Sequence, residues 1–101
     1  LPARDVSGED LGPVRYQGLA RIAWRSDQNG SSVSYEGRAD YFDVLSYYQR
    51  EFSALGFTQS VISATPKQET LRFSNGDEVL TLKIEAKPPL VSVDILSVPR
   101  S

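Results

Sequence analysis

The feature that most constrains this chain is its single segment with helical spacing, residues 41–55. Its apolar residues recur every three or four positions, so they form one stripe along a helix. Asp40 provides an N-cap, and its carboxylate also favours the positive end of the helix dipole. Gly56 suits the left-handed position after the last turn, so Phe57 should pack back on Phe52 in a Schellman ending. The stripe comprises Tyr41, Val44, Leu45, Tyr48, Phe52 and Leu55.

Outside this segment apolar and polar residues alternate, which favours β-strands. Strands are expected at residues 19–25, 33–38, 57–64, 68–74, 77–86 and 90–98. Short strands joined by turns, with one helix among them, indicate the α+β class. The expected fold is therefore a curved antiparallel sheet of about six strands packed on one helix, in the order β-β-α-β-β-β-β.

The register of two hairpins follows from their turns and apolar faces. Asn-Gly at residues 75–76 is a strong signal for a two-residue loop, which would pair Ser74 with Asp77. In the final hairpin, matched apolar faces set Lys83 opposite Asp94, a favourable cross-strand pair on the solvent face. The final strand, with outward apolar side chains, is the expected edge of the sheet.

The chain has 101 residues, which is the size of one domain. Residues 1–13 mix Gly and Pro with acidic residues and carry no apolar period, so we expect a flexible or loosely docked N-terminal arm there. Residues 14–101 are then a single α+β domain. No run of about 18 apolar residues occurs, so no transmembrane segment is expected.

Composition excludes several classes of chemistry. The chain has no Cys and no His, so it can form no thiolate nucleophile, imidazole base or Cys/His zinc site. It also has no glycine-rich phosphate-loop motif. We therefore expect no enzymatic activity, no cofactor and no metal site, while an enzyme that uses Arg and carboxylate groups stays a third alternative. With 11 Lys and Arg against 13 Asp and Glu, the net charge of −2 disfavours nucleic acid as a partner.

Two sets of side chains are candidates for ligand binding. The first is expected to point away from the helix, where it could meet phosphate or carboxylate groups or form a solvated face neutralised by nearby acids. It comprises Arg21, Arg25 and Arg72. The second is aromatic, and core packing is the alternative to a binding role. It comprises Trp24, Tyr41, Phe42 and Tyr47. Strict alternation on the first strand directs Trp24 and Ile22 toward the helix.

The end of the helix resembles a known group of domains. Residues 47–57 (YYQREFSALGF) carry the aromatic-Tyr…Leu-Gly-Phe helix exit seen in small domains of unknown function from bacterial envelope proteins and lipoproteins. Residues 14–18 stand where those domains have an Arg-Tyr-Pro-Gly-like segment, with Gln17 in place of Pro. A looser likeness is to the helix-grip domains of outer-membrane assembly lipoproteins. The resemblance implies an exported protein of the periplasm or cell envelope with a binding or scaffolding role, and it carries over no catalytic residue.

These observations favour a non-enzymatic binding or interaction domain of a bacterial envelope protein, which acts through a sheet face or an edge strand. The expected partner is a protein or another envelope component, and a second copy in a homo-oligomer is one such partner. The alternative is a small-ligand carrier with a pocket between helix and sheet, lined by Trp24, Tyr41 and Tyr48.

Overall fold

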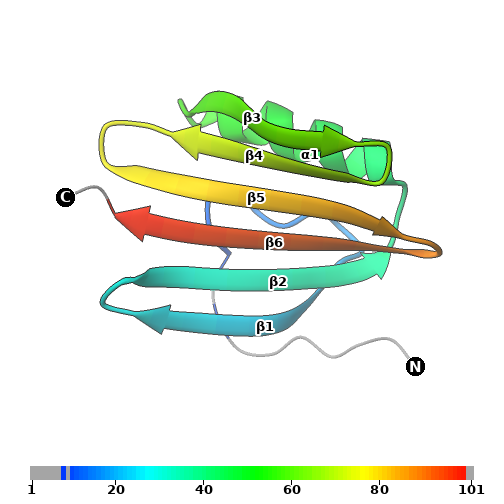
Figure 1. Cartoon of the computed structure of the whole chain (residues 1–101). Helices are drawn as coiled ribbons and strands as arrows, with labels where there is room; N and C mark the ends of the chain where they lie inside the picture. Colours follow the sequence, from blue (N-terminus) through cyan, green and yellow to red (C-terminus); the bar gives the residue numbers. More distant parts are fainter. Residues whose placement is uncertain (1–7, 9, 100–101) are drawn as a thin grey trace.

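Six strands and one helix follow one another along the chain in the predicted order (Figure 1). The structure, a computed structural model, describes residue 8 and residues 10–99. The elements are β1 (Ala20–Asp27), β2 (Gly30–Arg38), α1 (Tyr41–Ala54), β3 (Thr58–Thr65), β4 (Gln68–Ser74), β5 (Glu78–Lys87) and β6 (Leu90–Pro99). The predicted α+β class is confirmed. No helix among the described residues is long and apolar enough to span a membrane.

The strands form one antiparallel sheet in the order β1-β2-β6-β5-β4-β3. Its edges are β1 and β3, and β6 lies in the middle, paired with both β2 and β5. The expectation that the final strand is an edge was therefore wrong. After β2 the helix carries the chain to β3, at the opposite edge of the sheet. The edge of β2 that does not pair with β1 is therefore still open, and β6 pairs with it.

The helix α1 begins and ends as its sequence predicts. The Asp40 carboxylate accepts a hydrogen bond from the Asp43 backbone N–H at 3.0 Å, which satisfies one of the free donors of the first turn. At the other end Gly56 has a φ of 90°, and the Phe57 N–H donates to the Phe52 carbonyl at 3.1 Å. The Phe52 and Phe57 rings meet edge to face with centroids 5.4 Å apart, so the Schellman ending is confirmed.

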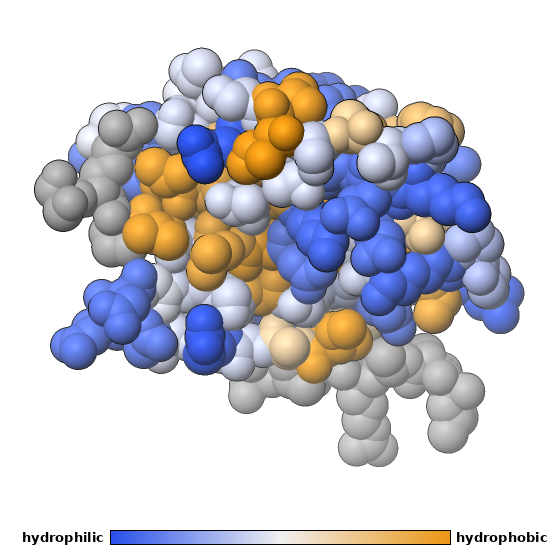
Figure 2. Space-filling model, viewed as in Figure 1, coloured by the Kyte–Doolittle hydropathy of each residue, from blue (hydrophilic) through white to orange (hydrophobic). Residues whose placement is uncertain are grey.

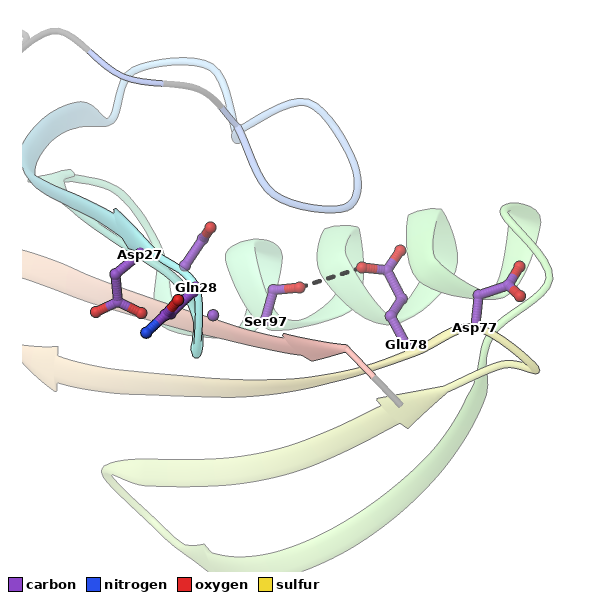
Figure 3. Close-up of a pocket in the computed structure, with 7 residues that line it drawn as sticks. Asp27, Gln28, Asp77, Glu78 and Ser97 are labelled. Atoms are coloured by element: carbon purple, nitrogen blue, oxygen red, sulfur yellow. Dashed lines mark hydrogen bonds between the residues drawn. The ribbon is translucent and has the colours of Figure 1, made fainter. Parts of the chain in front are cut away.

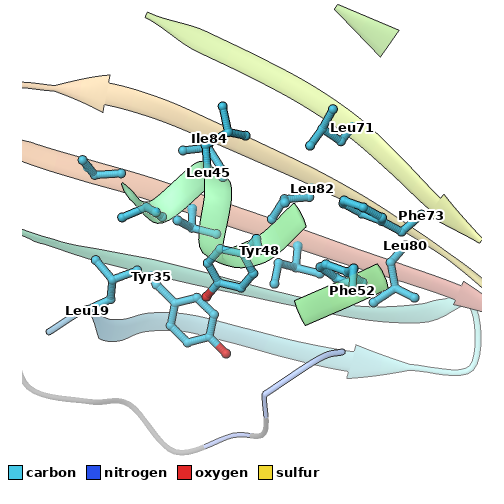
Figure 4. Packing of buried hydrophobic residues seen from close by; sticks show 14 of the residues in the cluster. Leu19, Tyr35, Leu45, Tyr48, Phe52, Leu71, Phe73, Leu80, Leu82 and Ile84 are labelled. Atoms are coloured by element: carbon cyan, nitrogen blue, oxygen red, sulfur yellow. The ribbon is translucent and has the colours of Figure 1, made fainter. Parts of the chain in front are cut away.

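The core lies between α1 and one face of the sheet, which we call the inner face; the opposite face is the outer face. In Figure 1 α1 runs behind β3 and β4. Phe52 of α1 stacks on Phe73 of β4 with ring centroids 4.1 Å apart, and both side chains are buried (Figure 4). Burial of one large apolar side chain contributes about 1.5–3 kcal/mol, so this layer is a main source of stability. Its largest buried side chains include Tyr35, Tyr48, Phe52, Phe73, Leu71, Leu80, Leu82, Ile84 and Ile95.

The hairpin of β5 and β6 has the predicted register. Lys83 lies opposite Asp94, and Ile84 lies opposite Val93. The Asp94 carboxylate also accepts a hydrogen bond from Ser34 Oγ of β2 at 2.5 Å. The matched apolar faces of the two strands thus define their pairing, because a shift of one residue would turn every apolar side chain to the wrong face.

The hairpin of β4 and β5 differs from its predicted register by two residues. Ser74 pairs with Val79, and the predicted partner, Asp77, lies in the turn. The Asn75 Oδ1 atom accepts hydrogen bonds from the backbone N–H groups of Asp77 and Glu78, at 2.8 and 2.9 Å. Asn75 therefore flanks the turn instead of occupying its first loop position. Because the shift is two residues, every side chain keeps its predicted face.

Strand β1 contains an irregularity that strict alternation does not predict. Its pairing with β2 shifts at Ile22, so Arg21 lies opposite Tyr35 and Trp24 lies opposite Val33. Tyr35 and Val33 are buried, so Arg21 and Trp24 both face inward, while Ile22 is exposed. The prediction that Arg21 points away from the helix was wrong, as was the inward placement of Ile22. A bulge adds one residue to the strand and reverses the alternation beyond it.

Candidate functional site

Residues 10–18, which we call the N-terminal segment, cover the part of the inner face beside α1. In Figure 1 this segment passes behind β5, β6 and β2. Leu11 and Tyr16 pack against the core. The Tyr47 hydroxyl of α1 donates a hydrogen bond to the Val14 carbonyl at 2.5 Å. The segment is therefore held against the helix by both apolar and polar contacts.

The predicted N-terminal arm, residues 1–13, overlaps this segment in part. Residues 1–7 and 9 lie outside the described residues. Gly12 approaches the core so closely that a Cβ atom there would lie 2.7 Å from the Phe52 ring. It also has a φ of 73°, a conformation that glycine adopts at little cost. Position 12 thus requires glycine for two independent reasons.

Asp10 is the polar centre of the N-terminal segment. Its Oδ1 atom accepts hydrogen bonds from Arg21 Nη2 at 2.8 Å and from the Tyr35 hydroxyl at 2.5 Å. Its Oδ2 atom accepts a third from the Arg15 backbone N–H at 3.3 Å. The Asp10 and Arg21 side chains are only 26% and 13% exposed, so water screens this ion pair weakly. We call Asp10, Arg21 and Tyr35 the carboxylate cluster.

The carboxylate cluster fixes the protonation state of its members. Burial raises the pKa of the Asp10 carboxyl, but hydrogen bonds from Tyr35, the Arg15 backbone and Arg21, with the Arg21 charge, outweigh burial, so the pKa lies below its ordinary value of 3.8. Burial, and then the hydrogen bond to Asp10, raise the pKa of the Tyr35 hydroxyl above its ordinary value of 10.0. At neutral pH an ionised carboxylate is thus held by a cation and a neutral hydroxyl donor, which is the chemistry of a carboxylate receptor.

Aromatic rings continue from the N-terminal segment into the core beside this cluster. Tyr16 meets Tyr47 edge to face at 5.3 Å, and Tyr47 meets Tyr48 in the same way at 5.2 Å. The Tyr48 hydroxyl accepts a hydrogen bond from the Tyr16 N–H at 3.2 Å, and burial raises its pKa. On β1, Trp24 lies so close to Gly8 that a Cβ atom there would lie 2.5 Å from the indole. The inner face therefore combines one charged receptor with aromatic walls.

The residues predicted to bind a ligand lie in three places, which are the inner face around the N-terminal segment, the start of α1 and the outer face. Arg21, Trp24 and Tyr47 lie on the inner face around the N-terminal segment. Tyr41 and Phe42 lie at the start of α1 with their rings edge to face at 5.2 Å, and Tyr41 is buried while Phe42 is exposed. Burial raises the pKa of Tyr41, whose buried hydroxyl has no hydrogen-bond partner among the described residues.

Sequence reasoning missed Asp10, Tyr16 and Tyr35 as site residues. Asp10 lies in a stretch with no apolar period, and its partners Arg21 and Tyr35 are 11 and 25 residues away. Alternation on β2 places the Tyr35 ring in the core correctly, but it carries no information on the hydroxyl. The available signal was a general one, since a buried tyrosine hydroxyl usually finds a hydrogen-bond partner.

The third place is the outer face, which carries Arg25 and Arg72. Both are exposed and lie in one row across the sheet, with Leu96 of β6 between them. Four strand spacings of about 4.8 Å separate them, so they cannot close on a single phosphate or carboxylate group. Figure 2 shows apolar side chains gathered on this face. A shallow groove of about 340 Å³ runs along it between side chains of β2, β5 and β6.

A pocket of about 330 Å³ lies at one end of the sheet, between the β1–β2 turn and the β4–β5 turn (Figure 3). Asp27, Asp77 and Glu78 supply its acidic side chains. Glu78 accepts a hydrogen bond from Ser97 Oγ at 3.1 Å, and Asp27 accepts one from a backbone N–H of its own turn at 2.8 Å. In the part of the chain that the structure describes, no three His, Cys, Asp or Glu side chains are grouped to hold a metal ion.

A family model described as START domain-like matches residues 20–94, from the start of β1 to the middle of β6. No curated protein and no solved structure matches the chain. The matched residues contain α1 and most of the sheet, and the N-terminal segment precedes them. The chain therefore belongs to the START domain-like family.

Proposed function

We propose that the chain is a non-enzymatic ligand-binding domain that takes an anionic small molecule with an apolar body on the inner face of its sheet. The carboxylate cluster carries this proposal, because an arginine and a tyrosine hydroxyl already hold one carboxylate there, that of Asp10. Membership of the START domain-like family supports it, since that fold is consistent with ligand binding. The site is the one next to the helix, and its polar end is Arg21 with Tyr35.

In this proposal the N-terminal segment is an internal competitor. A ligand carboxylate replaces that of Asp10 against Arg21 and Tyr35, and the segment moves aside. The apolar body of the ligand then packs against the rings of Tyr47 and Tyr48. Because the segment belongs to the same chain, it competes at a high effective concentration and lowers the apparent affinity for a free ligand.

The carboxylate cluster should discriminate by charge. When one carboxylate replaces another, a negative charge stays beside Arg21 and the Tyr35 hydroxyl still has an oxygen that accepts its hydrogen bond. An uncharged ligand would displace Asp10 without replacing its charge, which is costly at a site where Arg21 is only 13% exposed. We therefore expect selection for acids over alcohols of the same shape.

The test is calorimetric titration with 4-phenylbutyrate, with 4-phenylbutanol as the uncharged control. Asp10→Asn removes the charge that holds the N-terminal segment on Arg21 and hardly changes the size of the side chain. We therefore expect this variant to bind the acid at least about tenfold more tightly than the wild type does. Arg21→Met added to Asp10→Asn should abolish this gain. The fluorescence of Trp24, the one tryptophan of the chain, reports the same event independently. The proposal fails if Asp10→Asn binds the acid no better than the alcohol.

The outer face favours a second candidate function, interaction with a protein or another component of the bacterial envelope. Leu96 and Val98 are exposed on it, and clustered apolar side chains on a sheet face are typical of interaction sites (Figure 2). The resemblance of residues 47–57 motivates the exported, envelope location. We expect the wild type, and not Leu96→Asp, to co-sediment with the envelope fraction of the source cells. Equal sedimentation of the two would count against this candidate.

A further inference from the structure

We infer that β3 is a self-association strand, along which two copies of this chain join their sheets edge to edge as an antiparallel pair. This inference is independent of the ligand site and rests on the difference between the two edges of the sheet. All eight residues of β3 are exposed. Their sequence, TQSVISAT, contains no charged side chain and no proline. Such an edge presents unpaired backbone N–H and C=O groups without the side chains that usually protect them.

The other edge, β1, is protected by its charged side chains and by the N-terminal segment. Arg21, Arg25 and Asp27 lie within its eight residues, and Arg21 is bound to Asp10 of the N-terminal segment. A second copy that paired along β1 would have to bring these charged side chains into the junction and displace their water, and such charges usually protect an edge strand from pairing. The sheet therefore has one protected edge and one open edge.

The helix beside β3 extends this uncharged surface. α1 contacts β3, and it runs along the same side of the sheet (Figure 1). Phe42 is exposed, and it lies on the flank of α1 opposite to Tyr47, which contacts the N-terminal segment. Helical spacing continues the Phe42 flank through uncharged residues only. These are Ser46, Gln49 and Ser53.

A second copy is the partner that fits this edge. Two identical strands related by a two-fold axis pair antiparallel, and every contact then forms twice. Uncharged strands approach without repulsion, and the net charge of the whole chain is only −2. With the axis near the middle of β3, the exposed β-branched side chains of Val61 and Ile62 lie at the centre of the pair in both copies. Pairing thus buries apolar area and satisfies backbone groups together.

A bulge in β3 weakens this pairing without distinguishing the two edges. The register of β3 with β4 shifts at Ile62, just as the register of β1 with β2 shifts at Ile22. Bulges twist an edge and are one of its usual protections. Since both edge strands contain a bulge, the charged side chains of β1 are what distinguishes it from β3. We therefore expect a reversible dimer through β3.

Sedimentation velocity of the full chain, from about 5 μM to 1 mM, tests the inference, and the mass should rise from one copy to two with concentration. Ile62→Lys places a charge in the middle of the pair, so the dissociation constant should increase at least about tenfold. Ile22→Lys is the matched control, because Ile22 also lies at a bulge of an edge strand and is 39% exposed, against 48% for Ile62. We expect this control to dimerise like the wild type.

A wild-type chain that stays monomeric over this range overturns the inference, as does equal loss of association in both variants. If Ile62→Lys does not fold, Gln59→Lys on the same exposed strand replaces it. Amide hydrogen exchange gives a backbone measurement, in which β3 amides, and not β1 amides, should slow at high concentration. An extended peptide bound along β3 of a monomeric chain would also overturn the assignment of a second copy.

Discussion

The Asp10 carboxylate and the Arg21 guanidinium lie 2.8 Å apart, and this ion pair fastens the N-terminal segment to β1. Tyr35 donates a second hydrogen bond to the same oxygen. Both charged side chains are shielded from water, so loss of either one removes a close counter-charge from the other. Stability and the proposed ligand exchange therefore depend on the same carboxylate.

Asp10→Asn should lower the free energy of unfolding by about 1–3 kcal/mol at neutral pH, because a shielded, charged acceptor is lost. The pKa of Asp10 is depressed below 3.8 in the folded state, so its contribution is present above the unfolded pKa and is lost as pH falls through the folded pKa. The difference between wild type and variant should thus shrink as pH drops below 3.8. Urea unfolding at a series of pH values measures it.

Asp77→Asn is the matched control for this prediction, since Asp77 is an exposed carboxylate in the β4–β5 turn. We expect its free energy of unfolding to stay within about 0.5 kcal/mol of the wild type. The role assigned to the Asp10–Arg21 pair is contradicted if the two variants lose equal stability. It is also contradicted if the effect of Asp10→Asn persists unchanged in strong acid.

Alkaline pH should unfold the protein together with ionisation of its buried tyrosines. Burial raises the pKa of Tyr48, and burial with the hydrogen bond to Asp10 raises that of Tyr35, both above the ordinary 10.0. The folded state then keeps protons that the unfolded state releases, so stability falls as pH rises past 10.0. Tyrosinate absorbance and circular dichroism should change together in one titration. Ionisation of all five tyrosines in a chain that is still folded would refute this.

Gly12→Ala should destabilise the protein by about 1–3 kcal/mol, because it adds a Cβ atom in a left-handed conformation and against the Phe52 ring. Gly76→Ala is the control, since a Cβ atom there meets nothing within 4 Å and the residue has no positive φ. Thermal unfolding compares the two variants with the wild type. Equal melting temperatures for both variants would mean that the N-terminal segment is not docked as described.

Asn75→Ala should cost about 0.5–2 kcal/mol, because the turn loses an acceptor that holds two backbone N–H groups. Asn75→Asp keeps an oxygen in the same place, so it should retain most of the stability. Chemical unfolding of the three proteins provides the measurement. The Asx role of Asn75 is excluded if the Ala and Asp variants are equally destabilised.

Signals that act over a few residues predicted their parts of the fold correctly. Asp40 and Gly56 each act within one turn of α1, so their spacing in the sequence is sufficient. The β5–β6 register was also predictable, because a short loop and two clear apolar faces leave one pairing that satisfies both. The Asn75 turn shows the limit of such rules, since a side-chain acceptor changed the loop position without changing the faces.

Features that depend on distant residues could not be predicted in this way. The bulge at Ile22 forms against β2, and the central position of β6 is set by strands early in the chain. For the candidate site, Arg21 and Trp24 were identified, although on the wrong side of β1 for Arg21. Asp10 and Tyr35 were missed as a pair because a hydrogen bond between distant polar atoms leaves no trace in a hydropathy pattern.

The central position of β6 makes it the seam of the whole sheet. In the sheet order, β1 and β2 lie on one side of it and β5, β4 and β3 on the other. The two halves become a single sheet only when β6 pairs with β2, from Leu90 opposite Arg38 to Ser97 opposite Ser31. That closure spans most of the sequence, and such long-range pairing is slow to form. During synthesis, the edge of β2 that will pair with β6 therefore stays without a partner strand until β6 has been made.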